Sequence, residues 1–241
     1  MLKSSLLLSL LSATAFAAPY GRGDSYDRDE GDIISTMPGV LNVSGISLDR
    51  GILTINGSSG ADTASVAPGL ARGTIVAKRG NYSATYDASD VSKIVFNGND
   101  GDDTFTNTTS IPCEAYGNDG NDVLNGGSGL DSLQGDSGAD QFLFDSALNA
   151  ASNLDHILDF THGSDKIVLE NSVFATLATG ALSANAFVLG AAAADADDRI
   201  LYDAATGNLY FDADGTGATA KILFATLDTH PILTASDFQV I

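Results

Sequence analysis

The sequence predicts an all-β protein built on a parallel β-roll, or β-solenoid, followed by a β-sandwich-like cap. A nine-residue pattern that recurs four times carries this prediction, together with a block of acidic residues around it and short β-type runs on either side. The last three copies are in unbroken register, and the four copies read Gly98-Asn-Asp-Gly-Asp-Asp-Thr-Phe-Thr106, Gly117-Asn-Asp-Gly-Asn-Asp-Val-Leu-Asn125, Gly126-Gly-Ser-Gly-Leu-Asp-Ser-Leu-Gln134 and Gly135-Asp-Ser-Gly-Ala-Asp-Gln-Phe-Leu143.

Each copy combines a glycine-rich turn with a very short strand. A chain that reverses direction within about six residues needs positive φ angles and close backbone approach, which glycine adopts most readily. The eighth place is apolar in every copy and is predicted to point inward: Phe105, Leu124, Leu133 and Phe142. Because such a strand cannot bury a face alone, stacked coils must supply the core.

The sixth place of every copy is an aspartate, and these carboxylates predict a metal site. Calcium takes roughly six to eight oxygen ligands and accepts both carboxylates and backbone carbonyls, which glycine-rich turns expose. The repeats therefore predict two or three bound Ca²⁺ ions. The candidate metal-site residues are Gly98, Asp100, Gly101, Asp103, Gly117, Asp119, Gly120, Asp122, Gly126, Gly127, Gly129, Asp131, Gly135, Asp136, Gly138 and Asp140.

The nonapeptides resemble RTX, or hemolysin-type, calcium-binding repeats. That resemblance implies that each copy is half a coil, so residues eighteen apart stack on one side of the roll. Asp122 and Asp140 meet this spacing. Asp103 is nineteen residues from Asp122, so a one-residue bulge must intervene if it joins the same column.

Asp131 is predicted to face the opposite column, where the pattern is poor. Counting back one coil from Asp131 reaches Cys113, and counting forward one coil reaches Asn149. Residues 107–116 therefore form a degenerate coil. Cys113 is the only cysteine and cannot form an internal disulfide, so we expect it to pack in that coil.

Charge favours cations as ligands. The 241 residues carry a net charge of −20, from 31 acidic and 11 basic side chains. No Lys or Arg lies between Lys93 and Lys166, where 13 carboxylates occur. Without counterions such a block repels itself. It is a poor partner for nucleic acid, which needs a basic surface, whereas a protein or polysaccharide partner stays open.

Export is predicted from the first residues. Lys3 precedes a leucine-rich run, and Ala15-Phe-Ala17 fits a cleavage site, so residues 1–17 are read as a secretory signal peptide. The run is too short to span a bilayer, and no stable membrane insertion is expected. The protein is therefore predicted to be secreted and extracellular. Residues 18–38 are polar and patternless, which indicates a disordered linker.

The remaining segments are predicted to be β-structure on both sides of the roll. Residues 39–95 read as a divergent, mostly metal-free strand or solenoid region, with Asp62 in a weak relative of the repeat, and residues 96–145 form the roll itself. Residues 146–241 form the cap. Its expected elements are two strands joined by a turn at 155–160 and 163–169, a short helix or loop at 175–185, and a β-meander at 199–203, 208–212 and 221–227.

The cap resembles the C-terminal domain of serralysin-type metalloproteases and related RTX exoproteins. The matching motifs are Asp155-x-Ile-x-Asp-Phe160, Asp165-Lys-Ile-x-Leu169, Asp198-Arg-Ile-Leu-Tyr202, Leu209-Tyr-Phe-Asp-Ala-Asp-Gly-Thr-Gly217 and Leu233-Thr-Ala-x-Asp-Phe238. The resemblance implies a domain that caps the roll, with residues 237–241 serving type I export. Type I substrates usually lack a cleaved N-terminal signal, so the export route stays open.

No catalytic constellation emerges, and the chain is predicted to be non-enzymatic. The serralysin zinc motif His-Glu-x-x-His is absent, and the chain has only His156, His162 and His230. Adjacent carboxylates such as Asp102 and Asp103 point to opposite faces of a strand. Residues 212–217 resemble the opening of an EF-hand loop, but the twelfth place lacks the required Glu, which favours a hairpin turn.

Two alternatives remain at this stage. The first is an RTX-containing exoenzyme related to the serralysins or to alginate epimerases and lyases. Its catalytic face would lie in residues 39–96, in a groove formed by Lys78, Arg79, Tyr82 and Tyr86. The second is a calcium-dependent surface adhesin.

Overall fold

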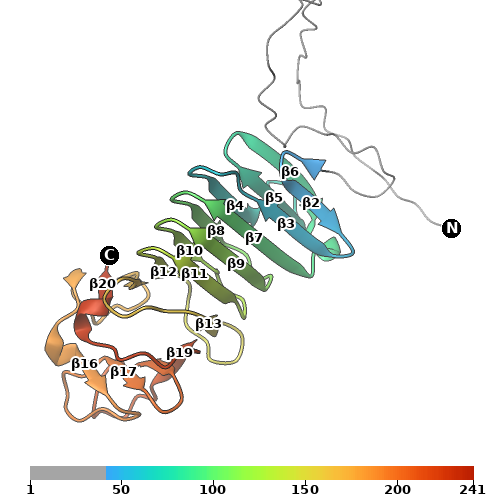
Figure 1. Cartoon of the computed structure of the whole chain (residues 1–241). Helices are drawn as coiled ribbons and strands as arrows, with labels where there is room; N and C mark the ends of the chain where they lie inside the picture. Colours follow the sequence, from blue (N-terminus) through green and yellow to red (C-terminus); the bar gives the residue numbers. More distant parts are fainter. Residues whose placement is uncertain (1–41) are drawn as a thin grey trace, which may run out of the picture. The chain divides into compact units, whose positions relative to one another are not determined.

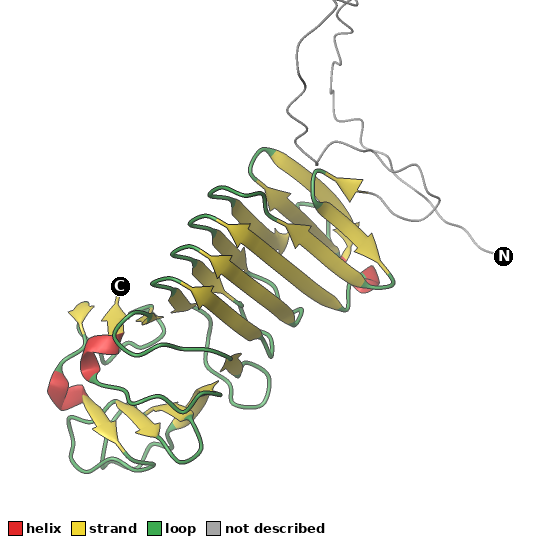
Figure 2. Cartoon of the chain, in the orientation of Figure 1, coloured by secondary structure: helices red, strands yellow, loops and turns green. Residues whose placement is uncertain are grey.

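The structure, a computed structural model, describes residues 42–241. The predicted signal peptide and linker lie outside the described residues. Within 42–241 the regular structure consists of β-strands and three short 3₁₀ turns, η1 (Ala88–Asp90), η2 (Ala184–Ala186) and η3 (Ala235–Asp237) (Figure 2). This part of the chain contains no helix long and apolar enough to cross a membrane. The predicted all-β fold class is confirmed.

The strands form two sheets that face each other along the roll (Figure 1). The first sheet has the order β1 (Asn42–Val43), β2 (Ile46–Asp49), β3 (Ile52–Asn56), β7 (Lys93–Asp100), β9 (Cys113–Asp119), β11 (Ser132–Ser137), β13 (Asp155–Ile157), β19 (Ile222–Leu227), β18 (Asn208–Phe211), β17 (Ile200–Asp203) and β16 (Phe187–Leu189). The second has the order β15 (Gly180–Ala181), β20 (Phe238–Val240), β14 (Lys166–Leu169), β12 (Gln141–Phe144), β10 (Val123–Asn125), β8 (Thr104–Asn107), β4 (Thr63–Pro68), β5 (Thr74–Arg79) and β6 (Tyr82–Asp87).

Each coil of the roll contributes one strand to each sheet. The pairs β3–β4, β7–β8, β9–β10, β11–β12 and β13–β14 stack in sequence order, and every strand pairs in parallel with its equivalent in the next coil. The strands β19 and β20 then pair in parallel with β13 and β14 as a last coil. The roll therefore continues into the segment predicted as a cap.

Two excursions leave the roll and return to it. Between the first and second coils, β5 and β6 add antiparallel strands beside β4. Between the fifth and last coils, residues 170–221 contain β15 to β18, and β17, β18 and β19 form the predicted antiparallel meander. The strands predicted at 155–160 and 163–169 do form, as β13 and β14, but they lie in different sheets as the two halves of one coil.

The core is a stack of inward side chains that pair between coils. In the first sheet the stack is Ile55, Phe96, Ala115, Leu133, Ile157 and Leu227, and in the second it is Ala64, Phe105, Leu124, Phe142, Ile167 and Phe238. All are buried. The rings of Phe96 and Phe105 stack across the roll with centroids 4.8 Å apart. The predicted inward orientation of the eighth repeat place is confirmed.

The extra residue between Asp103 and Asp122 lies in a turn. Inward residues along the repeats follow each other at intervals of nine, except that ten residues separate Phe105 from Ala115. The turn at 107–112 between β8 and β9 absorbs the additional residue, so the strand register on either side is undisturbed. The repeats therefore stay aligned despite the irregular spacing.

Candidate metal centre

Five aspartates line one side of the roll, one in each turn that leads from the first sheet to the second. The backbone N–H of each of the first four donates to Oδ1 of the aspartate in the following coil. We call this row the first column. Its hydrogen bonds run from Asp62 to Asp103 (2.6 Å), Asp103 to Asp122 (2.7 Å), Asp122 to Asp140 (2.9 Å) and Asp140 to Asp165 (3.1 Å).

The three central members of the first column each hold one carboxylate oxygen without a partner. Asp103, Asp122 and Asp140 are at most 1 % exposed, and the Oδ2 atom of each is buried with no hydrogen-bond donor near it. Leaving a buried carboxylate oxygen unpaired costs free energy, which a bound cation or a proton would lower. These three oxygens identify the candidate site.

The space beside each unpaired oxygen exists because the first repeat place is glycine. An added Cβ would lie closer than 3.0 Å to Oδ2 of the aspartate in the same turn, for the pairs Gly98 and Asp103, Gly117 and Asp122, and Gly135 and Asp140. Among residues 42–241 no cluster of three or more His, Cys, Asp or Glu side chains could hold a metal ion alone. A cation here would need turn carbonyls in addition to Oδ2, and that mixed oxygen set fits calcium.

The three central turns share one backbone conformation. The second repeat place is left-handed at Asn99 (φ 73°), Asn118 (φ 73°) and Asp136 (φ 63°), a region that Asn and Asp tolerate better than most residues. The fourth place is a glycine with positive φ in the same three turns, Gly101, Gly120 and Gly138. A Cβ at Gly120 or Gly138 would collide with the carbonyl oxygen of the equivalent glycine one coil earlier, so the turns stack closely. We call this shared turn conformation, with positive φ at the second and fourth repeat places, the cradle.

Burial raises the pKa of the three central carboxyl groups in the first column. Desolvation raises the pKa of Asp122 and Asp140 to about 6, the donated backbone N–H opposes the shift, and the charges of neighbouring carboxylates add to it. The pKa of Asp103 is raised for the same main reason. The first column thus concentrates negative charge where water cannot stabilise it, which favours a bound cation at neutral pH.

The opposite side of the roll carries a shorter second column, formed by Cys113, Asp131 and Asp155. The N–H of Cys113 donates to Oδ1 of Asp131 (2.7 Å), and the N–H of Asp131 reaches Oδ1 of Asp155 (3.4 Å). The prediction that Asn149 occupies the position one coil after Asp131 is wrong. The chain between β12 and β13 is longer than a regular turn, so Asp155 occupies that position instead.

Asp131 is the one regular repeat position of the second column. Its Oδ2 is buried without a partner and faces Gly126, where an added Cβ would collide with it. Burial raises the pKa of Asp131 to about 6 and that of Asp155 well above its usual value. Desolvation and the charge of Asp131 also raise the pKa of the Cys113 thiol. The thiol replaces a carboxylate here, as the degenerate coil predicts.

The remaining candidate residues lie at the rim of the turns. The third-place side chains of Asp100 and Asp119 are exposed, and Asp136 is exposed and accepts a hydrogen bond from Gln134 (2.6 Å). In the second column, Gly127 has a left-handed φ of 91° and Gly129 lies against the Asp131 carboxylate. The structure therefore brings together the glycines and sixth-place aspartates, while the other carboxylates surround them.

Three carboxylates of the site were not among the predicted residues. Asp165 extends the first column, Asp155 extends the second, and Asp159 accepts hydrogen bonds from the N–H groups of Gly135 (3.0 Å) and Asp136 (2.6 Å). Asp155 and Asp165 each stand two residues before an inward isoleucine, as the repeat aspartates stand before their apolar residue. That local pattern could have revealed them, although their spacing from the repeats could not.

The other sequence features do not assemble a second site. His156 and His162 pair with different carboxylates, Asp228 at 3.3 Å and Asp237 at 2.9 Å. Residues 212–217 form a turn in which the N–H groups of Asp214 and Gly215 donate to Asp212, as the hairpin interpretation predicts.

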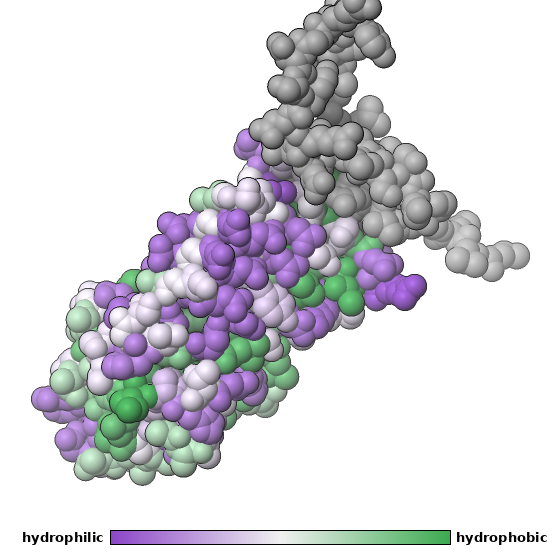
Figure 3. Space-filling view, in the orientation of Figure 1, coloured by the Kyte–Doolittle hydropathy of each residue, from purple (hydrophilic) through white to green (hydrophobic). Residues whose placement is uncertain are grey.

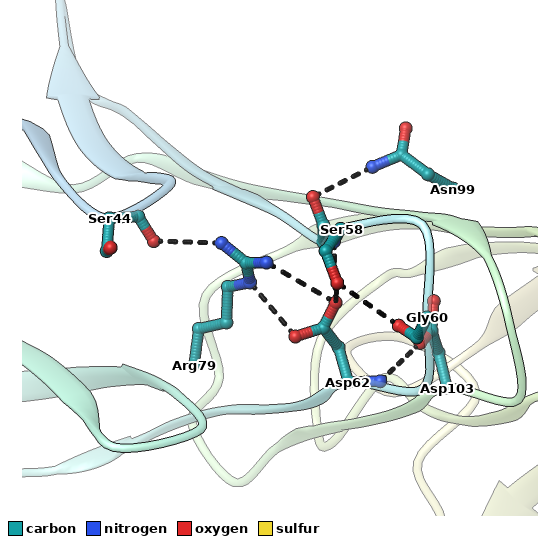
Figure 4. A network of polar contacts seen from close by, with 8 residues as sticks. Ser44, Ser58, Gly60, Asp62, Arg79, Asn99 and Asp103 are labelled. Atoms are coloured by element: carbon teal, nitrogen blue, oxygen red, sulfur yellow. Dashed lines mark hydrogen bonds and ion pairs between the residues drawn. The ribbon is translucent and has the colours of Figure 1, made fainter. Parts of the chain in front are cut away.

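The groove proposed for residues 39–96 is not formed. Tyr86 is buried in the core, and Arg79 is bound to Asp62 by an ion pair of 3.1 Å (Figure 4). Lys78 and Tyr82 are exposed, which leaves no basic and aromatic cleft shared by the four side chains.

Comparisons with known proteins agree with the repeat geometry. A family model described as the RTX calcium-binding nonapeptide repeat (4 copies) matches residues 116–146, which include the three repeats in unbroken register. No curated protein matches the chain. Among solved structures, the AlgE6R3 subunit of the Azotobacter vinelandii mannuronan C5-epimerase is similar, with 26 % identity over 61 % of this chain and 71 % of that chain and a TM-score of 0.31. By the family match alone, residues 116–146 are similar to RTX calcium-binding nonapeptide repeats.

Proposed function

We propose that the protein is a secreted, non-enzymatic calcium-binding protein whose roll folds when Ca²⁺ binds between its stacked turns. The observation that supports this most directly is the row of unpaired Oδ2 atoms in the first column, each beside a glycine. The match to calcium-binding repeats supports calcium as the cation.

In this proposal Oδ2 of Asp103, Asp122 and Asp140 would hold calcium, together with carbonyls of the adjacent turns. Bound calcium supplies positive charge that offsets the repulsion and desolvation of the column. The Oδ1 atoms meanwhile tie each coil to the one before it through the backbone N–H. Each aspartate would thus link cation binding to coil stacking, and binding free energy would become folding free energy.

Secretion is proposed from the signal-like residues 1–17 and from the chemistry of the site. Calcium outside cells is abundant enough for sites with dissociation constants of roughly 0.1–1 mM. A roll that needs such concentrations would stay loose in the cytosol and fold after export.

A pair of matched variants tests the proposal. We expect Asp122→Asn to lower calcium affinity at least about tenfold, since it removes one charged ligand while keeping an Oδ1 that accepts the Asp103 N–H. The control is Asp145→Asn, which removes the same charge at an exposed place directly after β12, outside the candidate site residues. Affinity is measured by calorimetric titration, and folding by far-UV circular dichroism with calcium and with a chelator.

Two results would contradict the proposal. One is a spectrum and melting midpoint that do not differ between calcium and chelator. The other is an equal loss of affinity in Asp122→Asn and Asp145→Asn, because that would place the effect in general surface charge and not in the buried column.

A further inference from the structure

The first turn of the first column is built differently from the three turns that follow. In residues 57–62 neither Ser58, in the second place, nor Gly60, in the fourth, has a positive φ. The equivalent places in the next three turns all do. The first turn therefore lacks the repeated cradle, although Asp62 still donates its N–H to Asp103 within the column.

A guanidinium group occupies the position beside Asp62. Nε of Arg79 donates to Oδ1 of Asp62 at 3.1 Å, and Nη2 lies 3.5 Å from Oδ2 (Figure 4). Ser58 completes the set, because its N–H (2.6 Å) and hydroxyl (2.9 Å) both donate to Oδ2. Both carboxylate oxygens of Asp62 are thus satisfied by protein groups, in contrast to Asp103 in the next coil.

The fold holds Arg79 in place from two sides. Arg79 ends β5, directly opposite Ala64 of β4, and its Nη1 donates to the carbonyl of Ser44 at 3.2 Å. Its side chain is only 18 % exposed. The adjacent Lys78 points to the outer face and is exposed. The ion pair therefore ties together the β1–β2 turn, the first coil and the β5 excursion.

The charge balance at this end of the column differs accordingly. Burial acts to raise the pKa of Asp62, but the hydrogen bonds from Ser58 and the ion pair with Arg79 outweigh it and lower that pKa. The charge of Asp62 is therefore offset by a cationic side chain of the protein itself.

We propose that Arg79 is a built-in cation for the first column, which neutralises Asp62 in place of calcium and keeps β3, β4 and β5 folded when calcium is absent. The folded end then presents the edges of β3 and β4 as a template, on which the coils that follow can pair. This inference rests on the proposed calcium-dependent folding of the repeats, and it adds that the dependence begins at the second coil.

Hydrogen exchange of the full chain tests this inference. In chelator, we expect amides of residues 46–79 to stay protected while those of 98–144 exchange rapidly, and in calcium both segments should be protected. Arg79→Gln should reduce the protection of residues 46–79 in chelator at least about tenfold, the size expected for the loss of one charge-assisted hydrogen bond. Lys78→Gln is the matched control, because it removes the same charge one residue away.

A second comparison separates the ion pair from a general loss of stability. If Arg79 acts through Asp62, Arg79→Gln should cost little further protection in an Asp62→Asn background, and Arg79→Lys should restore part of the protection. The inference is overturned if Arg79→Gln and Lys78→Gln behave alike in chelator, or if residues 46–79 lose protection in the unaltered protein on chelation.

The same data distinguish this inference from the proposed function. If residues 98–144 are equally protected with and without calcium, the proposed calcium-dependent folding fails. If those residues respond to calcium but residues 46–79 do so as well, only the role assigned to Arg79 fails.

Discussion

The first column shows how one side-chain type takes on different properties along a single row. Asp62 is satisfied by Arg79 and Ser58, and Asp165 is satisfied at its Oδ2 by the N–H of Thr161 (2.7 Å). Asp103, Asp122 and Asp140 lie between these ends, and each has an unpaired oxygen. Protein groups therefore satisfy the carboxylates at both ends of the column. Only the three central aspartates keep an oxygen that a cation would pair.

The raised pKa values predict opposite effects of pH with and without calcium. Folding raises the pKa of Asp122 and Asp140 from the usual 3.8 to about 6, so the folded, calcium-free state binds protons more tightly than the unfolded chain. Without calcium, the folded fraction of the roll should thus fall as pH rises from about 4 to about 6. With calcium, affinity should weaken as pH falls through about 6, because protons compete for the same oxygens.

Both effects can be measured on one protein preparation. Far-UV circular dichroism in chelator between pH 4 and 7.5 reports the first, and calorimetric calcium titrations across the same range report the second. Asp122→Asn should flatten both profiles. A calcium affinity that does not change between pH 5 and 7.5 would show that the buried carboxylates are not the ligands.

The regular repeats could be predicted from the sequence, whereas the elements around them could not. The places of Phe105, Leu124, Leu133 and Phe142 in the core follow directly from the nine-residue period. Asp155 and Asp165 escaped prediction because turns longer than those of the repeats set them 24 and 25 residues beyond their column partners.

Arg79 illustrates the limit of reading a sequence by its pattern. It stands in an ordinary strand, and only the antiparallel return of β5 beside β4 brings it to Asp62, 17 residues earlier in the chain. No local motif marks such a partner, because the contact depends on the length and direction of the excursion. The same reasoning explains why β19 and β20 were read as part of a cap and not as the last coil of the roll.

The stacked core predicts a strong difference between two leucines of the same region. Leu124 is fully buried between Phe105 and Phe142, whereas Leu130 is 53 % exposed in the following turn. Leu124→Ala should lower the free energy of unfolding in calcium by about 2–5 kcal/mol. Leu130→Ala should change it by less than about 0.5 kcal/mol. Urea unfolding at saturating calcium measures both, and equal effects would contradict the inward assignment.

The net charge of −20 affects the whole chain in the absence of cations. The visible face of the roll is mostly hydrophilic (Figure 3), and no Lys or Arg lies between Lys93 and Lys166 to offset the carboxylates there. Self-repulsion of this kind destabilises a compact state. Calcium would therefore act both locally, at the column, and globally, by lowering the total charge.

A comparison of two divalent cations separates these effects. Magnesium carries the same charge as calcium but requires a smaller, near-octahedral site and keeps several of its waters. We expect millimolar calcium to decrease the hydrodynamic radius of the chelated protein, and magnesium at the same ionic strength to do so far less. Dynamic light scattering or analytical size exclusion measures this change. Equal compaction by both cations would assign the effect to screening alone.

The late return of β19 and β20 to the roll has a kinetic consequence. Within the first five coils each strand pairs with its equivalent one coil later, at most 41 residues along the chain (Leu53 with Ile94). By contrast, β13 pairs with β19 70 residues farther along (Asp155 with Ala225). Closing so long a loop costs more entropy and slows the search for the partner strand. The roll is thus extended by shorter steps and completed by one more distant step, so we expect the last coil to form more slowly than the coils before it.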